Sequence, residues 1–211
     1  MLEYIGQTLT LIAFGLASPF GVNAGIEEPK YQVVQTLGDG IEIRDYDSRI
    51  AAETTMAASD PDRARSAGFD VIARYIFGDN QKRQSIAMTS PVEMKQGGTA
   101  IAMTAPVEMK TGAGGITMRF FMPASYRMES LPTPTDSRVR LVELPRTRQA
   151  VLRFTGSTSD AAIAEKTQRL LEALKASSWN ATGLASAYLY NPPWTLPFLR
   201  RNEVMVEVAA K

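Results

Sequence analysis

The chain has 211 residues, of which 45% are apolar and 21% charged, and its formal net charge is +1. This length and composition fit one globular domain, and the near-neutral charge excludes the basic surface that nucleic-acid binding needs. The sequence contains neither Cys nor His. Disulfides, thiolate or His-ligated metal sites, Ser-His-Asp catalysis and His-ligated haem iron are therefore excluded.

The first 24 residues differ in composition from the rest of the chain. Residues 8–24 carry no charge, include an apolar run and end in Val22-Asn23-Ala24, which has small residues where a signal peptidase cuts. Glu3 and the lack of an early Lys or Arg favour the alternative, an N-terminal helix packed on the domain. The run is too short for a membrane span. We expect a signal peptide at 1–24, a single domain at 25–211 and a periplasmic or secreted protein, which would be cytoplasmic if the segment is not cleaved.

The segment after this predicts three strands and a helix. Residues 31–36, 41–44 and 49–57 have strand character, with a Gly-Asp-Gly turn between the first two. Ser59-Asp60-Pro61 supplies an N-cap and a proline at the first helical position, so a helix should begin there and end near Phe77. Its two apolar stripes suit either a helix between a sheet and a second surface or a deeply buried helix. The stripes are Ala64, Gly68, Val71, Ile72 and Tyr75, and Arg65, Phe69, Ala73 and Phe77.

An internal repeat follows the helix. Residues 86–95 read IAMTSPVEMK and residues 101–110 read IAMTAPVEMK, with one difference in ten positions. Each copy contains a proline, Pro91 or Pro106, which cannot donate a hydrogen bond to a strand ladder. We therefore expect both copies to be extended and to lie close together at a sheet edge or bulge.

The remaining sequence repeats the order of strands, helix and strands. Ser159 can cap a second helix whose leucines recur at helical spacing. Two halves of this kind predict an α+β fold with one sheet or distorted barrel and two helices outside it. The expected elements are strands at 116–122, 138–144, 149–155, 184–190 and 203–208, and a Pro-rich loop at 123–136.

Several short motifs, in order and at fitting separations, resemble those of the SOUL/haem-binding protein family from about residue 28 to residue 208. The motifs are Tyr46 and its neighbours, the two IAMT[SA]PV segments, MRFFMP at 118–123, Pro132 to Pro134, Phe154-Thr155-Gly156, YNPPW at 190–194 and RRNEV at 200–204. The resemblance implies a twisted, distorted β-barrel of two similar halves flanked by two α-helices. It also implies kinship with the effector-binding domains of bacterial transcription regulators.

The resemblance implies non-enzymatic binding of haem or protoporphyrin, often without a firm axial ligand, by the first helix and a loop near the C-terminal strands. Carried over by position, Arg65, Phe69, Ala73 and Arg74 would line the pocket, and the two arginines could pair with the ligand's carboxylates or simply be solvated. Trp194 could form an aromatic lid or a plug at the mouth of the barrel.

Some relatives are proposed to use an axial His, and this chain has none. The remaining candidate iron ligands are Met88 and Met103, at matching positions of the repeat, although methionine more often fills a core. Three tyrosines could also supply a phenolate oxygen, namely Tyr46, Tyr75 and Tyr190. Arg200 and Arg201 could contact an anion, but they are better explained by a role in fixing the Asn-Pro-Pro-Trp loop to acidic groups.

These residues favour a haem or tetrapyrrole carrier or buffer whose partner is a small hydrophobic ligand, with no nucleic acid and no stable membrane span. A binding module for another flat hydrophobic molecule is the alternative. A carboxylate-dependent hydrolase, with Glu93 and Glu108 of the repeat, is a third hypothesis, but duplication alone explains why these two glutamates recur.

Overall fold

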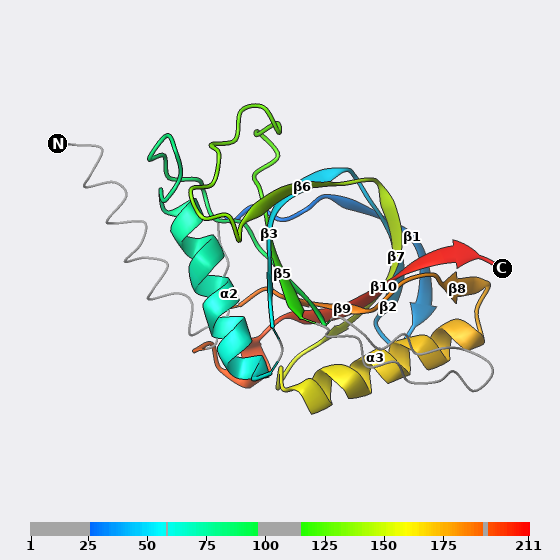
Figure 1. Cartoon of the computed structure of the whole chain (residues 1–211). Helices are drawn as coiled ribbons and strands as arrows, with labels where there is room; N and C mark the ends of the chain where they lie inside the picture. Colours follow the sequence, from blue (N-terminus) through cyan, green and yellow to red (C-terminus); the bar gives the residue numbers. More distant parts are fainter. Residues whose placement is uncertain (1–25, 58, 97–114, 192–193) are drawn as a thin grey trace.

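The structure is a computed structural model that describes residues 26–57, 59–96, 115–191 and 194–211. The predicted signal peptide, residues 1–24, and the second copy of the repeat lie outside the described residues. The described part is an α+β domain in which two helices pack on one large antiparallel sheet (Figure 1). Its elements are β1 (Tyr31–Gly38), β2 (Ile41–Tyr46), β3 (Arg49–Met56), α2 (Pro61–Ile76), β4 (Val92–Gln96), β5 (Ile116–Phe121), β6 (Arg140–Leu144), β7 (Thr147–Phe154), α3 (Asp160–Lys175), β8 (Trp179–Ala181), β9 (Ser186–Leu189), the 3-10 turn η2 (Pro197–Leu199) and β10 (Asn202–Ala210).

The sheet is strongly curved but open. Its strands follow the order β1-β2-β7-β10-β9-β4-β5-β3-β6, with β8 paired to β10. Figure 1 looks along the curl and shows it as a ring, yet among the described strands β1 pairs only with β2 and β6 only with β3. The predicted α+β fold with two helices is confirmed, whereas a barrel is not, because the sheet is not closed. Both edge strands have a feature that limits further pairing at a sheet edge. β6 has only five residues, and the register of β1 against β2 shifts at two points.

The chain has the two-part plan that its sequence indicates. In the first part β3 and β4 both pair with β5, and in the second part β7 and β9 both pair with β10. The two parts join through the pairs β2–β7, β3–β6 and β4–β9. Sequence analysis missed β8, because a strand of three residues is too short to show an alternating pattern.

Helix α2 begins and ends where its sequence predicts. Asp60 is the N-cap, and its side chain accepts a hydrogen bond from the Arg63 backbone N–H at 3.1 Å, with Pro61 at the first helical position. One face packs on β3 and β5 and belongs to a core cluster that includes Phe120 and Met118. The buried residues of this face are Ala64, Gly68, Val71, Ile72, Tyr75 and Ile76.

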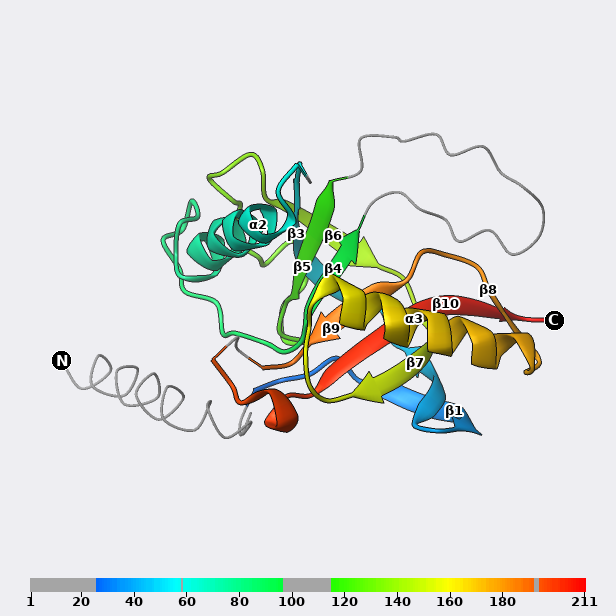
Figure 2. The same cartoon turned by 90° about the horizontal axis from the view of Figure 1, so that it is seen from below.

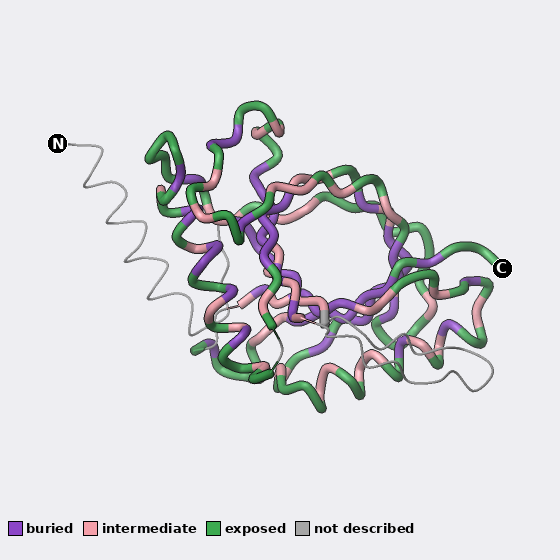
Figure 3. The backbone as a smooth tube through the Cα atoms, viewed as in Figure 1, coloured by how far each residue is buried: buried purple, intermediate pink, exposed green. Residues whose placement is uncertain are grey.

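Helix α3 covers the other part of the sheet, across β7, β8 and β10 (Figure 2). Ser159 caps it as predicted, accepting a hydrogen bond from the Ala162 backbone N–H. Leu170 and Leu174 pack against β2, β7 and β10, and Figure 3 shows that buried residues gather where the two helices cover the sheet. None of the helices in the described ranges is long and apolar enough to cross a membrane.

The first copy of the repeat does not lie at a sheet edge. Its second half forms β4, which pairs with β9 on one side and β5 on the other. Pro91 immediately precedes β4 and is not part of it. The hydrogen-bond ladder of β4 is therefore complete, although proline has no N–H to donate. The edge prediction is therefore wrong for this copy, and the second copy lies outside the described residues.

Candidate functional site

The outer face of α2 carries an exposed apolar stripe. Phe69 and Phe77 keep 43% and 58% of their surface exposed, and Ala73 lies between them at a spacing of four residues. The Phe69 ring packs edge to face on the ring of Phe120 in β5, and the two ring centroids are 5.4 Å apart. The alternative of a deeply buried helix is therefore wrong, because one stripe is core and the other faces outward.

The two arginines of α2 differ in their partners. Arg65 forms ion pairs with Asp62, at 2.9 Å, and with Asp160 of α3, so its charge is balanced within the chain. Arg74 is exposed and takes part in no ion pair in the part of the chain that the structure describes. It lies close enough to Asp136 to contribute slightly to the low pKa of that carboxyl, about 2, which is due mainly to hydrogen bonds from Arg138. Arg74 is thus the freer cation beside the stripe.

Trp194 lies on a separate segment. It is 63% exposed and lies just before η2. Figure 2 shows η2 well away from α2. An indole with this exposure does not plug the sheet's interior. Leu196 and Phe198 of the same segment are also exposed, at 44% and 69%.

Arg200 and Arg201 hold this segment in place. Arg200 Nε donates to the Thr195 carbonyl at 2.8 Å, and the Arg201 backbone N–H donates to Asn191 Oδ1 at 2.7 Å. The Arg201 guanidinium pairs with Glu28 and Glu203. The predicted role of Arg201 in fixing the loop to acidic groups is confirmed, whereas the guanidinium of Arg200 bonds to a backbone carbonyl.

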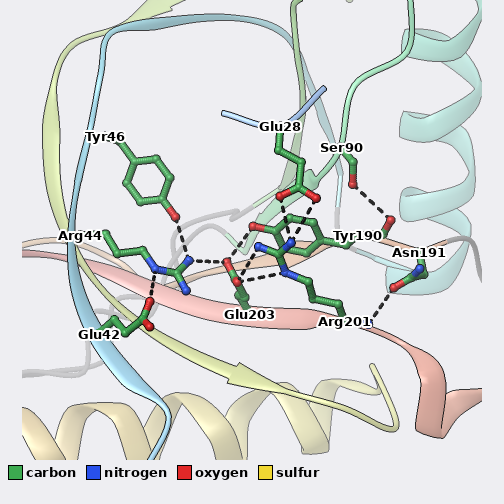
Figure 4. A network of polar contacts seen from close by, with 9 residues as sticks. All are labelled: Glu28, Glu42, Arg44, Tyr46, Ser90, Tyr190, Asn191, Arg201 and Glu203. Atoms are coloured by element: carbon green, nitrogen blue, oxygen red, sulfur yellow. Dashed lines mark hydrogen bonds and ion pairs between the residues drawn. The ribbon is translucent and has the colours of Figure 1, made fainter. Parts of the chain in front are cut away.

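The concave face of the sheet contains a buried network centred on Glu203, which has no exposed surface (Figure 4). Its Oε2 accepts hydrogen bonds from Arg44 Nη1 at 3.0 Å and from the Tyr190 hydroxyl at 2.7 Å. Its Oε1 accepts from Arg201, whose guanidinium also lies 3.7 Å from the centroid of the Tyr190 ring. Glu203 is thus a buried carboxylate with two cations and a phenol as partners, which compensates the cost of removing it from water.

A second network lies farther along the same face. Arg119 pairs with Glu53 and Glu93, at 2.6 and 3.2 Å, and Arg140 also pairs with Glu53. Glu93 is buried, and its Oε2 accepts a hydrogen bond from Arg119 Nη1. Its partner in the hydrolase hypothesis, Glu108, lies outside the described residues.

Sequence reasoning did not identify these inner-face residues as a site. In strands that alternate polar and apolar residues, the polar set normally faces solvent. Here the helices cover the apolar set, and the curl of the sheet encloses the polar set. The signal available in the sequence was a glutamate within a strongly apolar strand, as at Glu203 in β10.

Arg49 at the start of β3 lines two cavities among the described residues. The larger, about 390 Å³, lies among β3, the segment 121–129 and the segment 27–30. The smaller, about 120 Å³, is lined by residues of β4, β5, β7, β9 and β10 besides Arg49. Neither is lined by the residues predicted from the sequence, namely Arg65, Phe69, Ala73, Arg74 and Trp194.

Burial makes four of the described tyrosines, Tyr46, Tyr75, Tyr188 and Tyr190, unfavourable sources of an anionic oxygen for iron. Burial raises the pKa of Tyr46 and of Tyr75 to about 12, and the charge of Glu203 adds to the rise at Tyr46. Burial also raises the pKa of Tyr188 and Tyr190. All four hydroxyls therefore stay protonated at neutral pH, and each already has a hydrogen-bond partner. Of the methionines of the repeat, Met88 is partly buried, and its counterpart in the second copy lies outside the described residues.

The fold is similar to solved structures of low sequence identity. The crystal structure of the EcmrR C-terminal domain has a TM-score of 0.61 at 8% identity, over 86% of this chain and 99% of that chain. The cryo-EM structure of an EcmrR–DNA complex has a TM-score of 0.57 at 9% identity, over 100% of this chain and 68% of that chain. A hydrolase from Listeria innocua has a TM-score of 0.53 at 10% identity, over 81% and 92%. These likenesses show that the chain has the same α+β fold, and nothing about its ligand.

The family is shown by the sequence itself. The sequence model of the family described as SOUL heme-binding protein matches residues 26–207, which is most of the chain. The chain therefore belongs to the SOUL heme-binding protein family, and the resemblance found in its motifs is confirmed. No curated protein matches the sequence significantly.

Proposed function

We propose that this protein binds haem or another tetrapyrrole without catalysing a reaction, and that the flat ring lies on the exposed stripe of α2. The observation that carries the proposal is the exposure of Phe69 and Phe77 on either side of Ala73. Phe77, the C-cap of α2, follows Phe69 by eight positions, so the stripe is about 12 Å long at a helical rise of 1.5 Å per residue. The small Ala73 side chain leaves room for a flat face between them. Membership of a heme-binding family supports the same function.

The residues of this stripe fit a tetrapyrrole held by its ring and not by an iron–protein bond. The chain has no His or Cys, and burial raises the pKa of Tyr46, Tyr75, Tyr188 and Tyr190, whose hydroxyls are all hydrogen-bonded. Burying about 200 Å² of apolar surface contributes on the order of 5 kcal/mol before the entropic cost of association. Arg74, exposed and unpaired in the described part of the chain, is the cation we assign to a ligand carboxylate. We expect Arg65 to contribute less, because two aspartates already neutralise it.

The placement on α2 can be tested with one substitution and a matched control. Phe69→Asp should weaken binding of iron-free protoporphyrin at least about tenfold, because a carboxylate would have to be desolvated against the ring. Phe198→Asp makes the same chemical change at a more exposed phenylalanine of η2, away from α2. Fluorescence titration of each variant measures the affinity.

We expect Phe198→Asp to bind like the natural protein. Loss of binding in Phe198→Asp with none in Phe69→Asp would instead favour a site on the segment of Trp194, and would contradict the placement on α2. Equal loss in both variants, or loss in neither, would also contradict it.

A further inference from the structure

Exposed apolar side chains are concentrated in residues 194–199, which we call the tip. In the part of the chain that the structure describes, nine large apolar side chains are exposed, and four of them belong to the tip. They are Trp194, Leu196, Phe198 and Leu199, with exposed fractions of 63%, 44%, 69% and 38%. Single exposed apolar residues are ordinary on a protein surface, whereas a contiguous group of them marks a surface that meets a partner.

The backbone of the tip is fixed although its side chains are exposed. Three successive carbonyls, those of residues 195–197, accept hydrogen bonds from the protein itself. Their donors are, in order, Arg200 Nε at 2.8 Å, the Leu199 N–H at 2.9 Å and the Gly156 N–H at 2.9 Å. A backbone whose carbonyls are already bonded can enter an apolar medium without losing hydrogen bonds to water.

The size of the tip favours a lipid bilayer over a protein partner. Its four side chains together expose on the order of 400 Å². A stable protein interface takes roughly 800 Å² from each partner, about twice as much. Neither of the two cavities described above is lined by a residue of the tip, and Figure 2 shows η2 at the periphery of the molecule. Fluid lipid adapts to a small peripheral surface of this kind.

The residue types of the tip fit the same partner. An indole ring has an apolar body and one N–H donor, which suits the boundary between lipid headgroups and acyl chains. Phenylalanine and leucine are the side chains that interfacial segments insert beside it. Residues 191–199 contain no charged side chain that insertion would have to desolvate.

We propose that the tip attaches this protein reversibly to the surface of a lipid bilayer, separately from the stripe on α2. Leu196, Phe198 and Leu199 enter the boundary of the acyl chains, and Trp194 lies at the level of the headgroups, where its N–H donates to a lipid oxygen. Attachment of this kind needs no helix that spans the membrane.

Because the tip carries no charge, its attachment depends on apolar burial and not on the sign of the headgroups. Neutral phosphatidylcholine vesicles should therefore suffice as the probe. Binding should stay within about twofold between about 0.1 and about 1 M NaCl, although the screening length falls about threefold over this range. Binding that disappears at the higher salt concentration would show electrostatic adsorption and would contradict the proposal.

Co-sedimentation of the full chain with these vesicles, without tetrapyrrole, measures the attachment. Phe198→Asp should weaken it at least about tenfold, because a carboxylate would have to be desolvated among acyl chains. Phe77→Asp makes the same change at another exposed phenylalanine, at the end of α2, and should leave vesicle binding unchanged. All variants share residues 1–24, so a difference between them reports on the tip. Protoporphyrin binding should respond in the opposite way, which separates this proposal from the function proposed above.

Brominated phosphatidylcholine, which quenches an indole that it contacts, locates the inserted residue. The chain has two tryptophans, and Trp179 is buried. Quenching should therefore come from Trp194 and be abolished in Trp194→Phe, which keeps an aromatic ring and should still bind vesicles. Quenching that persists in this variant, or equal weakening by Phe198→Asp and Phe77→Asp, would overturn the proposal. Failure of the natural protein to bind vesicles would overturn it too, and self-association lost in Phe198→Asp would then assign the tip to a second copy.

Discussion

Glu203 shows at the scale of one residue how the interior of this sheet is stabilised. A fully buried carboxylate is tolerated because Arg44, Arg201 and Tyr190 all donate to it. Removing its charge leaves two guanidinium groups without their main counter-charge. We expect Glu203→Gln to lower the free energy of unfolding by about 3 kcal/mol, the cost typical of breaking a buried ion pair from one side.

Urea denaturation followed by circular dichroism measures this change. Glu207→Gln is the matched control, because Glu207 lies on the same strand but is exposed and in no ion pair among the described residues. The control should stay within about 0.5 kcal/mol of the natural protein. A Glu203→Gln variant as stable as the control would show that the network does not stabilise the fold.

Buried tyrosines make stability depend on alkaline pH. The pKa of Tyr46 and of Tyr75 is about 12 in the folded state, mainly because both are buried, and about 10 in an unfolded chain. Unfolding therefore releases protons between these values, so the contribution of both phenols is fully present below pH 10 and is lost as the pH rises to 12. We expect tyrosinate absorbance from Tyr46 and Tyr75 to appear together with unfolding. Gradual ionisation with the circular dichroism spectrum unchanged would contradict this expectation.

Within the secondary-structure elements, replacing glycine by alanine should have opposite effects on stability at two positions, depending on the space beside the backbone. A methyl group at Gly68, inside α2, would lie 3.5 to 3.8 Å from its nearest neighbours, which is ordinary contact. Gly68→Ala should therefore stabilise the fold by about 0.5–1 kcal/mol. At Gly115, before β5, the same methyl would lie 2.6 Å from the Met56 carbonyl oxygen. Gly115→Ala should destabilise by about 1–3 kcal/mol. Thermal unfolding measures both changes in stability. If both variants were stabilised, or both destabilised, the prediction would be contradicted.

The elements that the sequence predicted well are those with local signals. The N-caps at Asp60 and Ser159 mark where both helices begin, because capping depends only on neighbouring residues. The position of β4 was not predictable in this way. Pro91 indicated an edge, but which strands flank β4 is decided by pairing with β5 and β9, far away in the sequence.

At the scale of the whole molecule, the curl of the sheet determines which residues can form a site. The apolar stripe on α2 could be predicted from helical spacing and from the family's motifs. The ion pair of Arg65 with Asp62 is local to the helix, but its second partner could not be predicted, because Asp160 lies 95 residues away and meets it only in the folded chain. The cavity beside Arg49 likewise depends on curvature, which brings Thr147 and Gln149 of β7 opposite the start of β3.

We propose that this SOUL family protein holds a tetrapyrrole by its ring and not by its iron. Parallel titrations with haem and with iron-free protoporphyrin test this proposal. We predict dissociation constants within about threefold of each other, because burial of the same apolar ring supplies the binding free energy in both cases. We also predict no low-spin haem spectrum. Haem bound about a hundredfold more tightly than protoporphyrin, with a low-spin spectrum abolished by one Met or Tyr substitution, would contradict the claim.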